Sequence, residues 1–258
     1  MVIYFKMTIT ICCLLFSIGL QAQINESDSA RFQANLSFTG AWQEGNAEVL
    51  IFRNKAATSF RPFNKLVFKT QNTYLYQAFF KRRADEDFFS RNFVYYQPQQ
   101  KIYPFGLGFL ATNFRRQVAL RHFWGGGLTW QILRRKKQVL KLAISGAYES
   151  TRFTSNRFSD HRFDGKSIIT TWRATAWIFG QHQLGKVMRL HYEGYYQPSL
   201  ELSDNHRWQI DMGLDIPLWK FLDFRINYLH TYEQVVIVGT KQEDHILTFG
   251  IRLHLRSL

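Results

Sequence analysis

The chain has 258 residues and a formal net charge of +14, and 46% of its residues are hydrophobic and 17% aromatic. Beyond the N-terminal region no stretch approaches the roughly 18 consecutive apolar residues of a membrane-spanning helix, which excludes helical spans. Both cysteines lie within residues 1–22. Removal of that region therefore excludes disulfides, thiolate metal sites and a cysteine nucleophile.

Residues 1–22 have the pattern of a secretory signal peptide. Lys6 precedes a mostly apolar stretch from Met7 to Leu20, and Ala22 offers a small residue for cleavage. The alternative is a transmembrane anchor, but this stretch is shorter than the roughly 20 apolar residues that a span requires. We expect cleavage after Ala22, then a short N-terminal segment, residues 23–30, and a single β-barrel domain, residues 31–258.

Residues 31–43 alternate in polarity as a β-strand does. Phe32, Leu36 and Trp42 fall on one face and Gln33 and Ser37 fall on the other, because successive side chains of a strand point to opposite sides. In a soluble sandwich the apolar face would be the core. In an outer-membrane barrel the apolar face meets lipid and the polar face lines the interior.

Similar runs recur along the whole chain. They predict strands near residues 31–43, 47–60, 66–78, 87–97, 101–112, 119–133, 140–149, 168–178, 188–196, 208–216, 222–228 and 249–255. A spanning strand needs about 9–11 residues, so the chain has room for all of them and their turns. We therefore predict an all-β protein, a twelve-stranded antiparallel transmembrane β-barrel preceded by a cleavable signal peptide. A secreted soluble β-protein is the alternative.

The connections between these strands differ in length. The even-numbered links are short, at residues 61–64, 97–100, 134–137, 181–185 and 218–221, and most odd-numbered links are longer, at 79–86, 151–166, 198–205 and 235–244. Short turns on one rim and longer loops on the other are typical of bacterial outer-membrane barrels, with the short turns in the periplasm. An even strand number places both termini in the periplasm as well.

Several segments resemble a known family. They are LSFTGAWQEGNAEVLIFRNKAATSF at residues 36–60, QNTYLY at 71–76, KIYPFGLGF at 101–109 and RHFWGGGLTWQIL at 121–133. Together they resemble the domain-of-unknown-function family number 481, of the salt-stress-induced outer-membrane protein type, in homologues from Bacteroidetes-like bacteria. The resemblance covers residues 30–258. It implies an outer-membrane barrel without a settled biochemical activity, and it brings no catalytic residues.

Charged residues of the polar parity are expected to line the lumen. The basic ones are Arg53, Lys55, Lys65, Lys69, Arg91, Lys141, Arg173, Arg189, Arg207, Arg225 and Arg252, and their acidic partners are Glu149, Glu193, Asp211, Asp215, Asp223 and Glu233. A wall dominated by one sign of charge concentrates the opposite ion, which favours a narrow channel for small anionic solutes. Alternatively, ion pairs close the interior, and the protein is a non-conducting structural or stress-response envelope protein.

An outer-membrane hydrolase is a further alternative, and it would need a serine beside an oriented histidine. The pairs Ser159/His161 and Ser203/His206 lie in predicted loops without an evident orienting partner. We therefore expect no enzymatic activity and no catalytic residues. The histidines lack ligand spacing, so no metal and no cofactor is expected. The run at 125–127 lacks the lysine of a phosphate loop and is predicted to serve strand packing.

Basic residues also occur in the predicted outer loops, at 81–83 and at Arg152, Arg157 and Arg162. We expect them to meet membrane lipid and lipopolysaccharide phosphates, because these are the anionic groups next to the outer rim of such a barrel. Nucleic acid is not an expected partner of an exported barrel. The sequence leaves the oligomeric state open.

Overall fold

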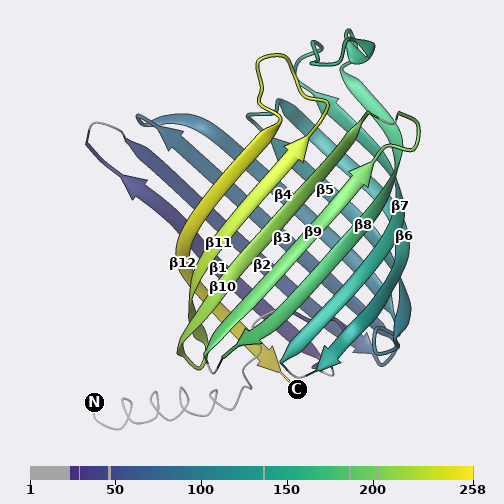
Figure 1. Cartoon of the computed structure of the whole chain (residues 1–258), viewed down its shortest axis with the longest axis vertical. Coiled ribbons are helices and arrows are strands. Elements are labelled where there is room, and N and C mark those ends of the chain that lie inside the picture. The colour runs from purple at the N-terminus through teal and green to yellow at the C-terminus, as the bar shows by residue number, and fades with distance from the viewer. Residues whose placement is uncertain are drawn as a thin grey trace, which may run out of the picture.

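The computed structural model describes residues 24–257, except residues 29, 46, 47, 136, 186 and 203. Within these residues, twelve antiparallel strands form one closed barrel (Figure 1). The strands are β1 (Phe32–Gln43), β2 (Val49–Phe63), β3 (Leu66–Phe79), β4 (Arg82–Tyr96), β5 (Ile102–Asn113), β6 (Val118–Arg135), β7 (Gln138–Phe153), β8 (Ile168–Leu184), β9 (Met188–Pro198), β10 (His206–Trp219), β11 (Leu222–Glu233) and β12 (Glu243–Ser257). The predicted barrel is confirmed. The predicted signal peptide, residues 1–22, lies outside the described residues.

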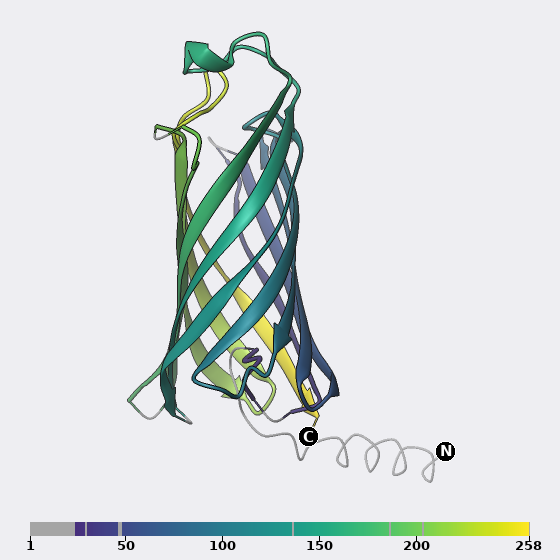
Figure 2. The same cartoon turned by 90° about the vertical axis from the view of Figure 1, so that its right-hand side faces the viewer.

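Pairing of β1 with β12 closes the ring. Phe32 is opposite Phe60 on β2 and opposite Ser257 on β12, and the β1–β12 register continues to the pair Gly40 and Phe249. The strands run at a steep tilt to the long axis of the barrel (Figure 2), as closure of a sheet requires. Closure leaves no exposed sheet edge. No helix among the described residues is long and apolar enough to cross a membrane.

The outward face of the barrel is apolar, and the inward face of most strands is polar. Every strand carries large exposed apolar side chains, for example Phe68, Trp124, Ile144 and Leu247, while serines, threonines, arginines and carboxylates of the opposite parity are buried. A soluble protein has the reverse arrangement. The surface therefore has the polarity that a membrane-spanning barrel presents to lipid.

The two ends of the barrel differ. The start of β1 at Phe32 and the end of β12 at Ser257 lie at the same end as the short turns between β2 and β3, β4 and β5, β6 and β7, β8 and β9, and β10 and β11 (Figure 1). We call this the terminal end. The connections 44–48, 80–81, 114–117, 154–167, 199–205 and 234–242 lie at the other end, which we call the loop end. All of the longest connections are there, as the alternation of link lengths predicts.

One predicted loop is wrong. Residues 79–86 do not form a long outer loop, because β3 continues to Phe79 and β4 begins at Arg82. The two residues between them, Phe80 and Lys81, have φ angles of 46° and 60°. Positive φ at both central residues makes a tight hairpin turn whose twist matches that of the strands. The sequence hides this turn, since it has no Asn-Gly or Asp-Gly pair and is rich in charge.

Two loops meet over one side of the loop end. The β7–β8 loop contains the short 3-10 helix η1 (His161–Phe163) and pairs with the β11–β12 loop through a bridge between Phe158 and Ile237. Phe158, Phe163 and Val235 pack with Val118 and further apolar side chains in a small core between these loops. Figures 1 and 2 show this pair of loops above the barrel rim. The loops are therefore packed against each other.

Close strand packing explains the glycines at 125–127. A Cβ atom at Gly125 would collide with the carbonyl oxygen of Gly146, and a Cβ atom at Gly127 would collide with that of Ile144. Only glycine lets neighbouring backbones approach this closely. The packing role predicted from the sequence agrees with this geometry.

Candidate functional site

The candidate site is the lumen, where most charged side chains are held in ion pairs. Toward the loop end, Glu149 on β7 accepts hydrogen bonds from Arg173 on β8 at 2.7 Å and from Arg207 on β10 at 2.5 Å. Glu233 on β11 binds Arg116 at 2.9 Å and also pairs with Arg121 on β6. Because β6 and β11 lie on opposite sides of the ring, the Arg121–Glu233 pair crosses the lumen.

Two further groups of ion pairs cross the middle of the barrel. Asp211 on β10 accepts hydrogen bonds from Arg53 and Lys55 on β2, each at 3.1 Å. Arg91 on β4 pairs with Glu193 on β9. Arg91 also donates two hydrogen bonds to the side-chain oxygen of Gln71, at 3.0 and 2.7 Å. These contacts join opposite walls, and a buried charge is tolerated only when it is paired in this way.

A third group lies toward the terminal end, on β9 to β12. The carboxylate of Asp215 accepts hydrogen bonds from Arg225 and Arg252, both at 2.6 Å. Asp223 accepts one from Arg189 at 2.5 Å. Asp215 and Asp223 are completely buried, so their charges depend on these arginines. This group lines one wall of the barrel and does not cross it.

The N-terminal segment occupies the terminal end of the lumen. Glu26 is buried and accepts hydrogen bonds from Lys141 on β7 at 2.7 Å and from the hydroxyl of Tyr103 on β5 at 2.7 Å. Lys69 on β3 lies 3.3 Å from the same carboxylate. Arg134 donates to the carbonyl oxygen of Ser27 at 2.8 Å. Contacts from four strands, β3, β5, β6 and β7, therefore fix this segment across the opening. It lies within the barrel outline in Figure 2.

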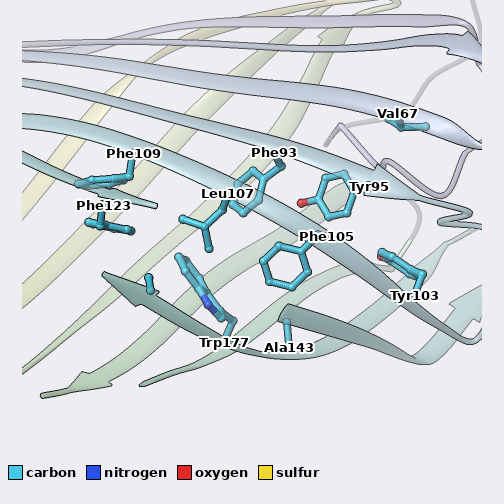
Figure 3. Close-up of a cluster of buried hydrophobic side chains, with 11 residues drawn as sticks. Val67, Phe93, Tyr95, Tyr103, Phe105, Leu107, Phe109, Phe123, Ala143 and Trp177 are labelled. Carbon is cyan, nitrogen blue, oxygen red and sulfur yellow. The ribbon is translucent and has the colours of Figure 1, made fainter. Parts of the chain in front are cut away.

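Part of the inner wall is aromatic. The buried cluster consists of Val67, Phe93, Tyr95, Tyr103, Phe105, Leu107, Phe109, Phe123, Ala143, Ala147 and Trp177 (Figure 3). Its rings are in contact, with Phe109 stacked on Phe123 at a centroid distance of 4.0 Å and Phe93 5.9 Å from Phe105. These side chains fill the lumen beside β3 to β8. The polar inward face predicted for the barrel strands is therefore absent from this wall.

Arg91 joins the aromatic cluster to the ion pairs. Its guanidinium carbon lies 5.5 Å from the ring centre of Phe89, 5.6 Å from that of Phe93 and 5.4 Å from that of Trp177. Arginine is attracted to aromatic faces at such distances. The guanidinium of Arg91 therefore contacts both the aromatic cluster and the ion pair with Glu193.

A cavity of about 150 Å³ lies at the loop end of the lumen. A separate and smaller cavity of about 30 Å³ lies toward the terminal end, beside Ile24 and Glu26. Among the described residues that line the larger cavity are seven basic side chains and four carboxylates. They are Arg53, Lys55, Arg91, Arg115, Arg116, Arg121 and Arg207, with Asp87, Asp211, Glu233 and Asp244. An excess of positive charge in a partly enclosed space favours a small anion.

The family described as "Protein of unknown function, DUF481" matches residues 16–253 of the chain. The chain belongs to this family. The family resemblance predicted from the sequence is thereby confirmed. No curated protein resembles this DUF481 chain closely enough to count as a match.

Solved structures share the barrel of this DUF481 protein. The NanC porin has 10% sequence identity and a TM-score of 0.54, over 85% of this chain and 100% of its own. The COG4313 outer membrane channel from Pseudomonas putida F1 has 8% identity and a TM-score of 0.50, over 91% of this chain and 100% of its own. At such low identity these likenesses show the fold alone.

The predicted lumen residues of the DUF481 barrel lie on its inner face, with one exception. Arg53, Lys69, Lys141, Arg173, Arg189, Arg207, Arg225 and Arg252 are buried, as are Glu149, Glu193, Asp211, Asp215 and Asp223, and Lys55 is half-buried. Lys65 is exposed in the β2–β3 turn at the terminal end. Its assignment to the lumen is wrong, because β3 begins only at Leu66.

Other lumen residues were not evident from the sequence. Arg116 lies in the β5–β6 turn and Arg121 on β6, and both face Glu233 from across the barrel. On β5 both faces are apolar, with Ile102 outward and Tyr103 and Phe105 inward. Such a strand shows no alternation of polarity. Arg121 has the same strand parity as Phe123 and Gln131, and this parity was the sequence signal for its inward orientation.

The serine and histidine pairs of the loops are engaged in loop structure. Ser159 accepts a hydrogen bond from the backbone of Val236 at 3.2 Å, whereas Nδ1 of His161 lies 2.8 Å from Asp164. This hydrogen bond raises the pKa of His161. The hydrogen bond from the backbone N–H of Phe158 lowers the pKa of Asp164, and the hydrogen bond with His161 lowers it further. Ser203 lies outside the described residues.

Proposed function

We propose that this protein is an integral barrel of the bacterial outer membrane whose lumen admits small anionic solutes from the loop end. Support for the membrane location comes from the exposed apolar side chains on every strand. Its structural neighbours, a porin and an outer membrane channel, agree with that location. The loop end faces outward and both termini face the periplasm, because short turns are periplasmic in such barrels.

The observation that carries the anion preference is the charge of the loop-end cavity. Seven basic groups face four carboxylates among the described lining residues. Among these basic groups Arg115 is accessible to solvent, with a side chain that is 40% exposed and lies 2.7 Å from Asp244. A solute carboxylate or phosphate would exchange water for charge-assisted hydrogen bonds from several guanidinium groups, which are stronger than neutral ones. The volume of the cavity suits a small anion and not a long oligosaccharide.

A second candidate function rests on the filling of the terminal half. Glu26 and the N-terminal segment cross the opening, and the Arg91–Glu193 pair spans the lumen above them. A barrel that keeps this arrangement is a non-conducting envelope protein with a filled interior. The two candidates differ in whether the segment leaves the lumen, so they differ in conductance.

Planar lipid bilayers test the channel. The folded protein is inserted under a potassium chloride gradient, and the reversal potential gives the ion preference. We expect anion preference. Lys55→Gln should reduce this preference, because it removes one positive charge from the cavity while Asp211 stays paired with Arg53. Lys65→Gln is the matched control, since Lys65 is exposed at the opposite end. Cation preference, or equal effects of the two variants, contradicts the proposal.

We propose that basic groups at the loop end contact lipopolysaccharide phosphates. Lys81 has a side chain that is 85% exposed, although it lies 3.8 Å from Glu48, and Arg83 is half-exposed beside Glu86 at 2.6 Å. Binding of detergent-solubilised protein to lipopolysaccharide should weaken with salt, because exposed charges are screened. It should weaken further in Lys81→Ser. Binding that changes neither with salt concentration nor in Lys81→Ser would contradict this contact.

We also propose that the protein has no enzymatic activity. Among the described loop residues, His161 is oriented by Asp164 but Ser159 is bound to the backbone of the neighbouring loop. The proposal is tested with phospholipid and peptide substrates on the purified folded barrel. Turnover that disappears in Ser159→Ala would overturn it.

A further inference from the structure

Two histidines and a glutamate meet on the outside of the barrel, near the loop end. His230 on β11 is directly opposite His245 on β12, and Glu243 is two residues before His245 on the same face. The imidazole ring centres are 3.8 Å apart. These residues lie next to the β11–β12 loop and are not part of the lumen, so they are separate from the proposed solute site.

We propose that His230, His245 and Glu243 form a binding site for a transition-metal ion of the zinc type. The Nε2 atoms of His230 and His245 lie 3.9 and 3.7 Å from Oε2 of Glu243, and one ligand atom from each residue lies within 4.8 Å of the others. In a tetrahedral zinc site, with bonds of 2.0–2.1 Å, ligand atoms are about 3.4 Å apart. Small side-chain rotations therefore complete the geometry.

The state of His230 supports this site independently. Its Nε2 atom is shielded from solvent and has no hydrogen-bond partner among the described residues. A buried nitrogen without a partner costs free energy, and a metal ion would remove that cost. The ring of Trp208 packs edge-to-face against His230, with the ring centroids 4.4 Å apart. This packing restricts the orientation of the imidazole.

A second contact orients His245. Nδ1 of His245 lies 2.9 Å from the hydroxyl of Tyr228. When Nδ1 carries the proton, its N–H donates a hydrogen bond to the tyrosine oxygen, and the lone pair of Nε2 is free for a metal. Metal-binding histidines characteristically donate their other ring N–H to such a partner. Tyr228 therefore acts as a positioning residue, not as a ligand.

The donor set and its place define the class of ion. Two imidazoles with one carboxylate suit zinc, copper or nickel, whereas calcium and magnesium prefer oxygen ligands alone. The side chains of Glu243 and His245 are 54% and 53% exposed, so an ion from water reaches them at the barrel rim. The fourth position would be left to water. Bound metal would tie the last residues of β11 to the first residues of β12.

Cobalt absorption tests the site, because tetrahedral cobalt has an intense visible spectrum. The full chain without an affinity tag is folded in detergent micelles, titrated with Co²⁺ and then with Zn²⁺. We expect one Co²⁺ per barrel, displaced by Zn²⁺ and removed by chelator. Single variants His230→Ala and His245→Ala should each weaken binding at least about tenfold, and the double variant should abolish the spectrum.

Two further variants separate a metal site from an ordinary aromatic and histidine surface. Tyr228→Phe should weaken binding by about tenfold while every ligand remains, as expected of an orienting partner. His161→Ala, which removes an exposed loop histidine beside Asp164, is the matched control and should bind as the unaltered chain does. Retention of the fold in each variant is checked by its resistance to unfolding in detergent on gels. Absence of Co²⁺ binding, or binding unaffected by loss of both His230 and His245, overturns the proposal.

Discussion

Nζ of Lys141 lies 2.7 Å from the carboxylate of Glu26, so the barrel wall holds the N-terminal segment across its own opening. Lys69 lies 3.3 Å from the same carboxylate, and the side chains of all three residues are nearly inaccessible to water. The wall lysines therefore depend on the segment for their counter-charge, and the segment depends on them for its place.

Glu26→Gln should release the N-terminal segment. Loss of one partner of a buried ion pair costs about 3–5 kcal/mol, since the remaining charge stays buried. Detachment of the segment relieves this cost, so we expect larger or more frequent single-channel currents than in the unaltered chain. Labelling of a Ser27→Cys reporter, at a position that is 0% exposed, should also become faster.

Glu44→Gln is the control for this experiment, because Glu44 is an exposed carboxylate at the loop end. It should change neither current nor labelling. Currents that are absent both before and after Glu26→Gln, despite faster labelling, would favour the filled, non-conducting candidate. Unchanged labelling would contradict the role given to the Glu26 ion pairs.

The Arg91–Glu193 pair should show strong coupling in a double-mutant cycle. Arg91→Met and Glu193→Met each leave one buried charge, so each should lower the free energy of unfolding by about 3–5 kcal/mol. The double variant should lose less free energy of unfolding than the sum of the two single losses, because no uncompensated charge remains. Urea unfolding of the barrel in lipid vesicles measures these free energies. Simple additivity would show that the pair does not interact.

Depth in the membrane should decide the effect of an outward arginine. Ile144 is 66% exposed in the middle of β7, and Ile168 is 53% exposed at the loop end of β8. Ile144→Arg should cost about 2–4 kcal/mol in bilayers and Ile168→Arg about 0–1 kcal/mol. Unfolding in lipid vesicles compares the two. Equal costs would mean that the outward face does not meet hydrocarbon as proposed.

The His161–Asp164 contact should weaken as pH rises. The hydrogen bond to Asp164 raises the pKa of His161 above its ordinary value. The contribution of this hydrogen bond to the stability of the fold is therefore complete below the pKa that His161 has in the unfolded chain. It is lost as pH rises through the raised pKa. NMR titration of labelled histidine should show a lower His161 pKa in Asp164→Asn. Asp204→Asn serves as control, because Asp204 contacts Arg162. Equal shifts in both variants would contradict the assignment.

Alternation of side chains determined the barrel from the sequence alone. Where one face of a strand is apolar and the other polar, as in residues 31–43 and 208–216, the period of two fixes both the strand and the side that each residue faces. The same parity placed Arg173, Arg207 and Asp215 inside. It failed at Lys65, which lies in the turn just before β3 and is exposed. It also failed at Phe80-Lys81, where backbone geometry alone makes the turn.

Contacts across the lumen and between strands were decided only by the closed tertiary structure. Arg53 and Asp211 are far apart in the chain, and no local pattern pairs them at 3.1 Å. Nor does any spacing in sequence bring His230 opposite His245, because strand register sets that contact. Periodicity assigns a residue to a face, whereas closure of the ring sets which faces meet and what space remains between them.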